Sequence, residues 1–467
     1  MTMRTPERLG FDTAPKAQPT GSADLAENAS PLAGSALCVI GGGFVGLVSA
    51  AGFADFGHSV ICVENNPSRL EKLKSGKIPF YERDLDELIA RNVKRDRLSF
   101  CAELKLSIKG AKAIFITVGT PSGKDGRTDL SALDKVIQSL ADNLEPNQVV
   151  VIKSTAPVGT ARKVKEKIAL LRNSSDAISV ISNPEFLREG TAVYDFFHPQ
   201  RIVIGGDNQE ATELISNIHR LGMKQNTPIV VTNNETAEMI KYASNVFLAT
   251  KIGFVNELAE LCDKIGVNAL EVARGMGLDP RIGSDFLDPG PGWGGSCLPK
   301  DLSEYIGLAH AHDASVTIAR AVREANLLQR NYVVSKARDI LGDLENKRIG
   351  ALGLTFKAET SDLRNSPAID IIRGLQREGA TILAHDPVAN GDASQLLENV
   401  ELCDSAEGVA KDADLLIILT EWKQFQLLDW KKIGDIMKSR YVLDTRNLIS
   451  PEFLRGNGFT YVGTGVS

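Results

Sequence analysis

The feature that most constrains the fold of this chain is a glycine motif at residues 41–46. Residues 36–40 form a short apolar run typical of a buried parallel strand, and this run leads directly into Gly-Gly-Gly-Phe-Val-Gly. The small, apolar residues 47–56 that follow predict a helix. A strand, a G-x-G-x-x-G turn and a helix in this order are typical of a dinucleotide-binding βαβ unit. The sequence therefore predicts an α/β fold that begins at residue 35.

Each glycine of this motif has a physical role in the predicted unit. Gly41 permits the tight turn, Gly43 lets a pyrophosphate approach the backbone, and Gly46 lets the helix pack on the strand. The free N–H groups at the helix N-terminus favour phosphate. A second apolar run at residues 59–63 ends on Glu64, whose carboxylate can accept hydrogen bonds from ribose hydroxyls and repels a 2′-phosphate. These residues predict NAD, rather than NADP, as the cofactor.

The alternation of strands and helices continues through the first half of the chain. Predicted strands at 112–118, 149–152 and 178–181 lead into loops at 119–122, 153–159 and 183–190. In open parallel sheets, ligands lie beyond the strand ends, so the first two loops should border the cofactor. The third loop carries Glu185 and Glu189, which are either site carboxylates or the solvated first turn of a helix.

From Thr232 to about Lys264 the pattern becomes helical, and a further helical stretch covers about 314–341. Lys241, Asn245 and Ala249 lie four residues apart on one stripe of the first helix. Such a stripe is usually exposed, but facing a reactive group it would provide a charge and a hydrogen-bond donor for an oxyanion. The helix is long for a globular domain, so we expect it to connect domains and to pack against a partner subunit.

A second α/β block opens at residue 347 and repeats the plan of the first. It lacks an intact G-x-G-x-x-G motif, so we expect it to bind something other than NAD. Lys357, Arg364 and Arg446 follow its predicted strands and suit a phosphorylated or nucleotide-bearing substrate. The predicted fold is therefore two Rossmann-like, doubly wound α/β domains joined by a long central helix. The expected parts are a disordered tail (1–34), an NAD-binding domain (35–232), a central helical and dimerisation region with the cysteine loop (233–345) and a substrate-binding Rossmann-like domain (346–467).

The loop at residues 289–301 carries the candidate nucleophile. Its glycines and prolines bring the backbone close to a ligand, and it ends on Cys297, Leu298, Pro299, Lys300 and Asp301. Positive charge near a thiol favours the reactive thiolate, although a cysteine in such a loop is more often a structural thiol. In an NAD enzyme a nucleophilic cysteine indicates oxidation at the aldehyde level, through a thiohemiacetal and a thioester that is then hydrolysed.

Composition narrows the function classes further. The 467 residues carry a formal charge of -6, which gives no electrostatic case for nucleic acid or an anionic membrane as a partner. The six cysteines are scattered without zinc-like spacing and predict reduced thiols in a cytoplasmic protein. No apolar run approaches the length of a membrane span, and residues 1–34 lack the apolar core of a signal peptide.

Taken together, these segments resemble the nucleotide-sugar dehydrogenase family, the UDP-glucose/GDP-mannose dehydrogenases. The resemblance covers nearly everything from Ser35 onward and rests on five segments besides Phe356-Lys357: residues 41–46, 154–160, 183–190, 238–245 and 294–301. It implies an NAD-dependent enzyme that oxidises the primary alcohol at C6 of a nucleotide sugar twice, forming the uronic acid. Family members form dimers or larger assemblies, and we expect a homodimer.

The resemblance also implies roles for individual residues. Cys297 would carry the covalent intermediates, Lys241 and Asn245 would stabilise oxyanions, and Asp301 would orient or deprotonate water. Thr155 and Glu185 would position water and act in acid/base chemistry. The residues expected at the cofactor are Gly41, Gly43, Phe44, Val45, Gly46, Glu64, Asn65, Arg69, Val118, Gly119, Thr120, Ser154, Thr155, Glu189, Lys300 and Arg364. Those expected at the substrate are Glu185, Phe186, Leu187, Arg188, Lys241, Asn245, Arg281, Phe286, Leu287, Gly290, Gly294, Cys297, Phe356, Lys357 and Arg446, with Arg281 acting across a subunit boundary in some members; no metal site is expected.

Three kinds of substrate are used within this family: UDP-glucose, GDP-mannose and UDP-N-acetylhexosamines. The last group typically has a histidine where Ser296 stands, and residues 242–250 look more like the UDP-glucose branch than the GDP-mannose branch. We therefore expect UDP-glucose. Trp293 departs from the family pattern and is expected to add aromatic surface beside the sugar. A non-catalytic nucleotide-sugar-binding scaffold is the alternative from another class, but it would not need the thiol and its partners.

Overall fold

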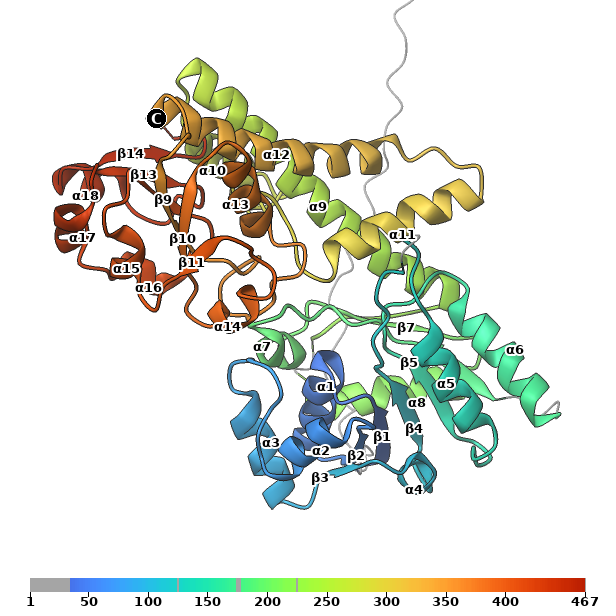
Figure 1. Ribbon diagram of the computed structural model, residues 1–467. Helices are drawn as coiled ribbons and strands as arrows, with labels where there is room; N and C mark the ends of the chain where they lie inside the picture. The colour runs from blue at the N-terminus through green and yellow to red at the C-terminus, as the bar shows by residue number, and fades with distance from the viewer. Residues whose placement is uncertain (1–33, 124–125, 174–177, 224–225, 467) are drawn as a thin grey trace, which may run out of the picture. The chain divides into compact units, whose positions relative to one another are not determined.

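The structure is a computed structural model, and it describes residues 34–123, 126–173, 178–223 and 226–466. The predicted disordered tail lies outside these residues except for Gly34. Gly34–Ser467 form one compact unit. Two sheets of mainly parallel strands and the helices around them make up this unit, as the ribbon in Figure 1 shows.

The first sheet contains eight strands in the order β3-β2-β1-β4-β5-β6-β7-β8. All neighbouring strands are parallel except β6 and β7, so the first six have the strand order of a Rossmann fold. The strands are β1 (Ala36–Ile40), β2 (Ser59–Val63), β3 (Leu98–Cys101), β4 (Ala113–Ile116), β5 (Val149–Ile152), β6 (Ser179–Ser182), β7 (Ile202–Gly205) and β8 (Ile229–Thr232).

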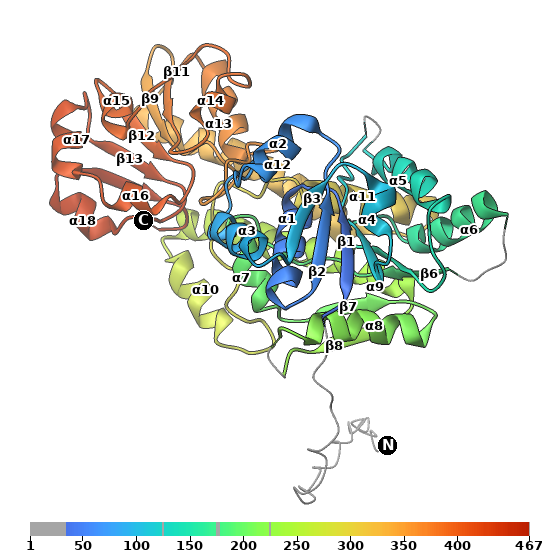
Figure 2. The ribbon, with the colours of Figure 1, turned by 90° about the horizontal axis from the view of Figure 1, so that it is seen from below.

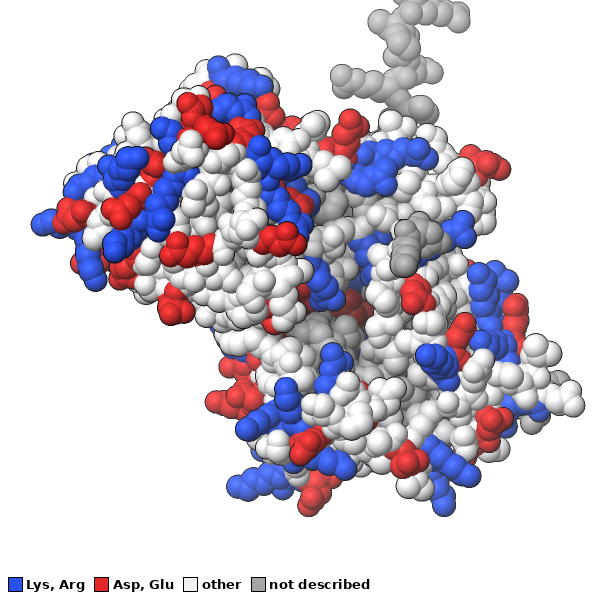
Figure 3. Space-filling view, in the orientation of Figure 1, with Lys and Arg blue, Asp and Glu red and all other residues white. Residues whose placement is uncertain are grey.

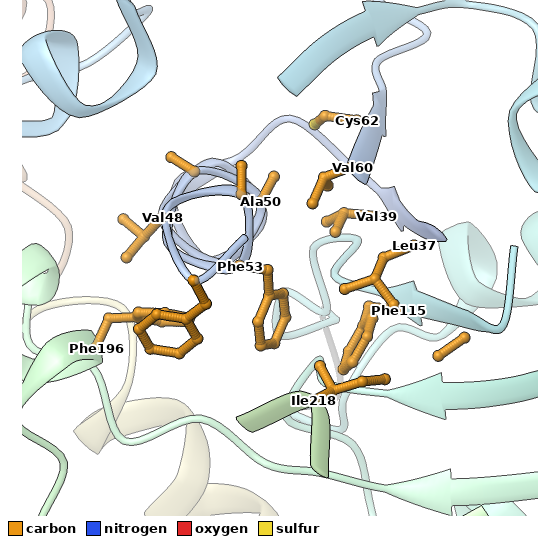
Figure 4. Close-up of a cluster of buried hydrophobic side chains, with 14 of the residues drawn as sticks. Leu37, Val39, Val48, Ala50, Phe53, Val60, Cys62, Phe115, Phe196 and Ile218 are labelled. Carbon is orange, nitrogen blue, oxygen red and sulfur yellow. The ribbon is translucent and has the colours of Figure 1, made fainter. Parts of the chain in front are cut away.

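Helices cover both faces of this sheet (Figure 2). On one face, Phe53 and Phe196 pack with Phe115 and Ile218, as Figure 4 shows. On the other face of the sheet, Ile137 belongs to a second buried apolar cluster, which covers the opposite side of the same strands. The helices are α1 (Phe44–Asp55), α2 (Pro67–Lys74), α3 (Leu85–Lys94), α4 (Leu104–Ile108), α5 (Ser131–Ala141), α6 (Thr160–Arg172), α7 (Ala192–Phe197) and α8 (Gln209–Arg220).

The middle of the chain is helical. Helix α9 packs against α11 and α12 and runs for 32 residues. It begins after an Asn233 cap that accepts the Thr236 N–H, and it ends where Gly266 adopts the left-handed conformation. The helices of this region are α9 (Asn234–Ile265), α10 (Ala269–Gly277), α11 (Leu298–Ala311) and α12 (Thr317–Leu341).

The two ends of α9 are fixed to different sheets. Near its start, Glu238 accepts hydrogen bonds from the backbone N–H groups of Gly159 (2.6 Å), the residue before α6, and Ala161 (2.9 Å), in the first turn of α6. Near its end, Asp263 forms a 2.6 Å ion pair with Lys336, which also donates to the backbone oxygen of Gly463 in the second sheet. The predicted joining helix is therefore confirmed.

The second sheet contains six parallel strands in the order β11-β10-β9-β12-β13-β14, which repeats the Rossmann order. The predicted fold class is confirmed. The strands are β9 (Arg348–Leu352), β10 (Thr381–His385), β11 (Val400–Leu402), β12 (Leu415–Ile418), β13 (Tyr441–Asp444) and β14 (Thr460–Gly463). The helices are α13 (Pro367–Arg377), α14 (Asn390–Ala393), α15 (Ala406–Ala410), α16 (Lys423–Gln426), α17 (Trp430–Ile436) and α18 (Pro451–Gly456).

Basic and acidic side chains are interspersed over the face seen in Figure 3. None of the helices in the described ranges combines the length and the apolar character that crossing a membrane requires.

Candidate active site

Cys297 lies at the N-terminal end of α11, as the residue before the first helical position. It is exposed to solvent, while its backbone oxygen accepts the first hydrogen bond of the helix from Asp301 (2.9 Å). Gly295 precedes it with φ +80°, and a Cβ there would lie 2.9 Å from the Phe356 ring. The Gly295 N–H donates to the backbone oxygen of Arg364 (2.9 Å), so the loop 356–364 of the second sheet helps to fix the thiol.

The predicted stripe on α9 faces this thiol and is buried. Lys241 is 4% exposed and pairs with Glu185 at 3.0 Å, and Asn245, one turn later, donates to Asp301 at 2.5 Å. Lys300 donates to the other carboxylate oxygen of Asp301 at 2.6 Å. The loop carrying Glu185 has no helical turn, because residues 183–188 run as irregular chain. The alternatives of an exposed stripe and a solvated helix start are therefore wrong for Lys241, Asn245 and Glu185.

Charged side chains of both signs surround the Cys297 sulfur in this cluster. Burial works against the charge on Lys241, but Glu185, and then Cys297 and Asp301, outweigh burial and raise the pKa of Lys241. Although solvent reaches Cys297, the surrounding protein desolvates the sulfur and raises the pKa of its thiol, while Lys241 acts in the opposite direction. Lys241 is thus a positively charged ammonium group beside the thiol at neutral pH.

Thr155 lines a small cavity beside this cluster. The cavity has a volume of about 10 Å³ and is also bordered by Ser154, Ser182, Glu238 and Lys241. A space of this size, with several polar groups around it, is just sufficient for one water molecule. The backbone oxygen of Thr155 accepts a 2.7 Å hydrogen bond from Thr120, so the loops after β4 and β5 are joined here.

The predicted cofactor residues lie mainly at the carboxyl ends of β1, β2, β4 and β5. Gly41 has φ +111°, and a Cβ on Gly46 would lie 1.8 Å from the Gly41 oxygen, whereas nothing lies within 4 Å of a Cβ built on Gly43. The turn therefore requires glycine at two positions and leaves a free approach at the third, which fits a pyrophosphate. Glu64 is buried at the end of β2 and accepts the Asn66 N–H at 2.7 Å.

The other predicted cofactor residues fall into two groups. One group follows the strands of the first sheet or begins α1: Phe44, Val45, Asn65, Arg69, Val118, Gly119, Thr120, Ser154 and Thr155. The second group lies at the cysteine loop instead. Glu189 accepts a hydrogen bond from Ser296 at 3.2 Å and lies 3.6 Å from Arg364, while Lys300 contacts Asp301.

The predicted substrate residues come mostly from segments that meet at the cysteine loop. The Arg446 guanidinium donates to the Phe356 oxygen (3.0 Å), and a Cβ on Gly290 would lie 3.1 Å from it. Lys357 has a pKa lowered by burial. The Phe186 ring contacts two cations, Arg201 at 3.6 Å and Lys241 at 5.3 Å from the ring centroid.

The remaining substrate residues are placed as follows. Leu287 is buried, Phe286 has φ +64°, and a Cβ on Gly294 would lie 2.2 Å from the backbone oxygen of Asn365. The Leu187 side chain packs against the apolar core of the first sheet, and its N–H donates to Glu185 at 2.5 Å.

Two predicted substrate residues point to solvent within this chain. Arg281 has a side chain that is 88% exposed and pairs with Asp279 two residues away. Arg188 is also exposed and pairs with Asp195 at 2.7 Å. Neither is brought to Cys297 by a contact within the chain.

The expectation for Trp293 is wrong. Its side chain is 6% exposed and packs with Ala249, Leu302 and Val322, in the apolar cluster between α9, α11 and α12. The indole therefore contributes its apolar surface to this core and leaves little aromatic surface for a sugar.

Comparison with known proteins decides the family. Residues 35–221, 235–327 and 350–451 match, in this order, the NAD binding, central and UDP binding domains of the UDP-glucose/GDP-mannose dehydrogenase family. A UDP-glucose 6-dehydrogenase of Rhizobium meliloti is 43% identical over 92% of this chain and 99% of its own length. The chain belongs to the UDP-glucose/GDP-mannose dehydrogenase family.

Other members of the UDP-glucose/GDP-mannose dehydrogenase family show the same extent of similarity. The UDP-glucose 6-dehydrogenase TuaD of Bacillus subtilis is 39% identical over 92% of this chain and 93% of its own length. The structure of a UDP-glucose dehydrogenase from Pyrobaculum islandicum is 33% identical, with a TM-score of 0.84 over 96% of this chain and 100% of that one. A UDP-D-ManNAc dehydrogenase from Pyrococcus horikoshii is 28% identical, with a TM-score of 0.81 over 92% and 99% of the two chains.

Membership of the UDP-glucose/GDP-mannose dehydrogenase family makes the chain an oxidoreductase with NAD as its cofactor. The glycine turn after β1 and the buried Glu64 fit this cofactor. The nicotinamide supplies the acceptor for a hydride. The prediction of NAD is confirmed.

Three residues of this site were not predicted as site residues from the sequence. Lys153 is buried, donates to Asn183 at 3.2 Å and has a pKa lowered by burial to about 8. Its signal was a lysine directly after an entirely apolar strand. Glu238 was noticed only as a member of a motif, and Ser296 only as a position that separates substrate branches. Their partners, Gly159 and Glu189, are far away in the sequence.

Proposed function

We propose that this protein oxidises UDP-glucose at C6 to UDP-glucuronate, using two molecules of NAD. The observation that carries the proposal is the cluster around Cys297: a solvent-accessible thiol beside a buried Lys241–Glu185 pair and a buried Asn245–Asp301 pair. The relatives named UDP-glucose 6-dehydrogenase, similar over almost their whole length, support this substrate.

The residues around the thiol have distinct roles in the proposed reaction. The C6 alcohol is first oxidised to the aldehyde, and the Cys297 sulfur then adds to the aldehyde carbon as a thiohemiacetal. Lys241 and Asn245 donate to the C6 oxygen while it carries negative charge, which a buried ammonium and amide do at low dielectric. Loss of a second hydride gives the thioester.

Hydrolysis of the thioester requires an ordered water molecule. Asp301 would take a proton from that water, and Asn245 and Lys300 hold its carboxylate in place. Thr155 and Glu185 would position the water, which the cavity of about 10 Å³ beside Thr155 supports.

The two α/β halves divide the remaining work in this proposal. The residues from 35 to 232 would bind NAD, those from 346 to 467 would hold the UDP-sugar through Phe356, Lys357 and Arg446, and the central residues from 233 to 345 would supply the thiol. Phe286, Leu287, Gly290 and Gly294 would enclose the sugar. Oxidation of GDP-mannose and oxidation of UDP-N-acetylhexosamines remain the alternatives. Residues 242–250 argue against the first and Ser296 against the second.

We also infer that the protein is a homodimer held by α9. Phe247, Phe254, Leu261 and Ile265 are large apolar side chains on this helix that are 49–64% exposed. The first three are seven residues apart and so share one face. A stripe of this kind suits the same helix of a second copy. The free thiols support a reducing compartment, such as the cytoplasm.

The first experiment measures NADH formed per mole of limiting UDP-glucose, with GDP-mannose and UDP-N-acetylglucosamine in parallel. Two NADH from UDP-glucose alone are expected. The control is Cys297→Ala, which should not complete the second oxidation. One NADH per sugar, turnover with another nucleotide sugar only, or full two-step turnover by Cys297→Ala would overturn the proposal.

A further inference from the structure

The Ser296 hydroxyl lies between the thiol of Cys297 and the carboxyl group of Glu189. Its Oγ is 3.6 Å from Cys297 Sγ and donates to Glu189 Oε1 at 3.2 Å. Both distances are within hydrogen-bonding range for the atoms concerned. The Ser296 hydroxyl donates its own proton to Glu189. Its oxygen can therefore accept a hydrogen bond from the Cys297 thiol.

Glu189 is held where three segments of the chain meet. Its Oε2 accepts from Thr360 at 3.4 Å, and its Oε1 lies 3.6 Å from Arg364. The charged groups that face it are Asp362, Arg364 and Lys357. Burial, with Asp362, raises the pKa of Glu189 to about 7, so this carboxyl group can gain or lose a proton near neutrality.

The charged groups that face the Cys297 sulfur come from three elements and the 356–364 loop. They are Lys241 from α9, Glu185 from the 183–190 loop, Asp301 from α11 and Arg364. Glu185 and Asp301 are both engaged with cations, Lys241 and Lys300. Glu189 is instead connected to the sulfur through the hydroxyl group of Ser296.

We propose that Ser296 is a positioning residue that relays the Cys297 thiol proton to Glu189. The S–H bond breaks as the proton passes to Ser296 Oγ, and the original Ser296 proton passes to Glu189 Oε1. The products are a thiolate that accepts a hydrogen bond from Ser296 and a neutral Glu189, with no change in total charge. The inference rests on the proposed function for the nucleophilic role of Cys297.

The relay has a particular consequence for the pH dependence of the thiolate. Above pH 7, Glu189 is ionised and can accept the thiol proton, so a fixed fraction of chains holds a thiolate with a neutral Glu189. That fraction stays constant until the thiol itself loses its proton to solvent, above its usual range. Below pH 7, Glu189 is already protonated, and the thiolate falls about tenfold per pH unit.

The test is the rate of alkylation of Cys297 by iodoacetamide from pH 5 to 10, without substrate or NAD. Mass spectrometry of the Cys297 peptide separates this thiol from the other cysteines. The wild-type protein should show one rise ending near pH 7, a plateau, and a second rise at high pH. Glu189→Gln should show the second rise alone.

Ser296→Ala removes the hydroxyl and should lower the plateau at least tenfold, while Ser296→Thr, which keeps the hydroxyl, should restore it. A Ser296→Ala profile with an unchanged plateau, or a wild-type profile with a single rise at high pH, would overturn the relay. Thermal melting of each variant checks folding. A uniform fall in rate at every pH would indicate a purely structural role for Ser296 and would also overturn it. The NADH yield is measured separately, so failure of the relay does not affect the proposed function.

Discussion

At the scale of single residues, Lys241 is the group of the site whose charge is costly to bury. A lysine that is 4% exposed pays a large desolvation cost, and its 3.0 Å pair with Glu185 offsets that cost. Removing either partner would leave the other charge buried without its ion-pair partner. Because Glu185, Cys297 and Asp301 outweigh burial and raise the pKa of Lys241, the arrangement keeps a cation beside Cys297 at neutral pH.

We therefore predict that Lys241→Met lowers kcat by about 10²- to 10³-fold, the usual loss when one oxyanion donor is removed. Because Glu185 would be left without its cation, the variant should also melt at a lower temperature. Steady-state kinetics and thermal melting measure the two effects. The control is Lys165→Met, which removes a half-exposed lysine on α6 that forms only a long surface pair with Asp207 (3.8 Å), and it should change neither. Wild-type kcat in Lys241→Met would contradict the prediction.

At the scale of elements, the sequence predicted the strands and long helices well and the loops poorly. The apolar runs at 59–63 and 149–152 became β2 and β5 with the expected bounds. The stripe of Lys241 and Asn245 was visible from helical periodicity. Its orientation was not, because that depends on Glu238 bonding to Gly159, 79 positions earlier in the chain. Trp293 was misplaced for a related reason: its loop gave no sign of the cluster between α9, α11 and α12.

The attachment of α9 to the first sheet gives a prediction at this scale. Glu238→Ala would leave the N–H groups of Gly159 and Ala161 and the hydroxyl of Ser182 without their acceptor. We expect a destabilisation of about 2–4 kcal/mol, since several buried donors lose one charged partner. The melting temperature should fall by several degrees. Glu235→Ala, which loses an exposed pair with Arg162, should change stability by less than about 0.5 kcal/mol. Equal effects of the two substitutions would refute this role.

At the scale of the whole molecule, the exposed stripe on α9 predicts the state of association. Phe254→Glu places a charge in the middle of the stripe formed by Phe247, Phe254, Leu261 and Ile265. We expect the variant to be a monomer where the wild type is a dimer, as measured by light scattering after size-exclusion chromatography. Phe453→Glu, at an equally exposed position on α18, should leave the dimer intact. A dimeric Phe254→Glu protein, or a monomeric wild type, would contradict the proposed interface.

The contact of Gly295 with Phe356 has a consequence for the whole molecule. The backbone of the cysteine loop is held by the C-terminal sheet, through the Arg364 oxygen and the Asn365 side chain, which donates to the Gly295 oxygen at 3.1 Å. The position of the Cys297 thiol therefore depends on the folding of the C-terminal half of the chain. Strain or partial melting there will be transmitted to the sulfur over a distance of two residues, before it reaches the glycine turn that receives NAD. Loss of the nucleophile will thus precede loss of the cofactor when the C-terminal half loosens.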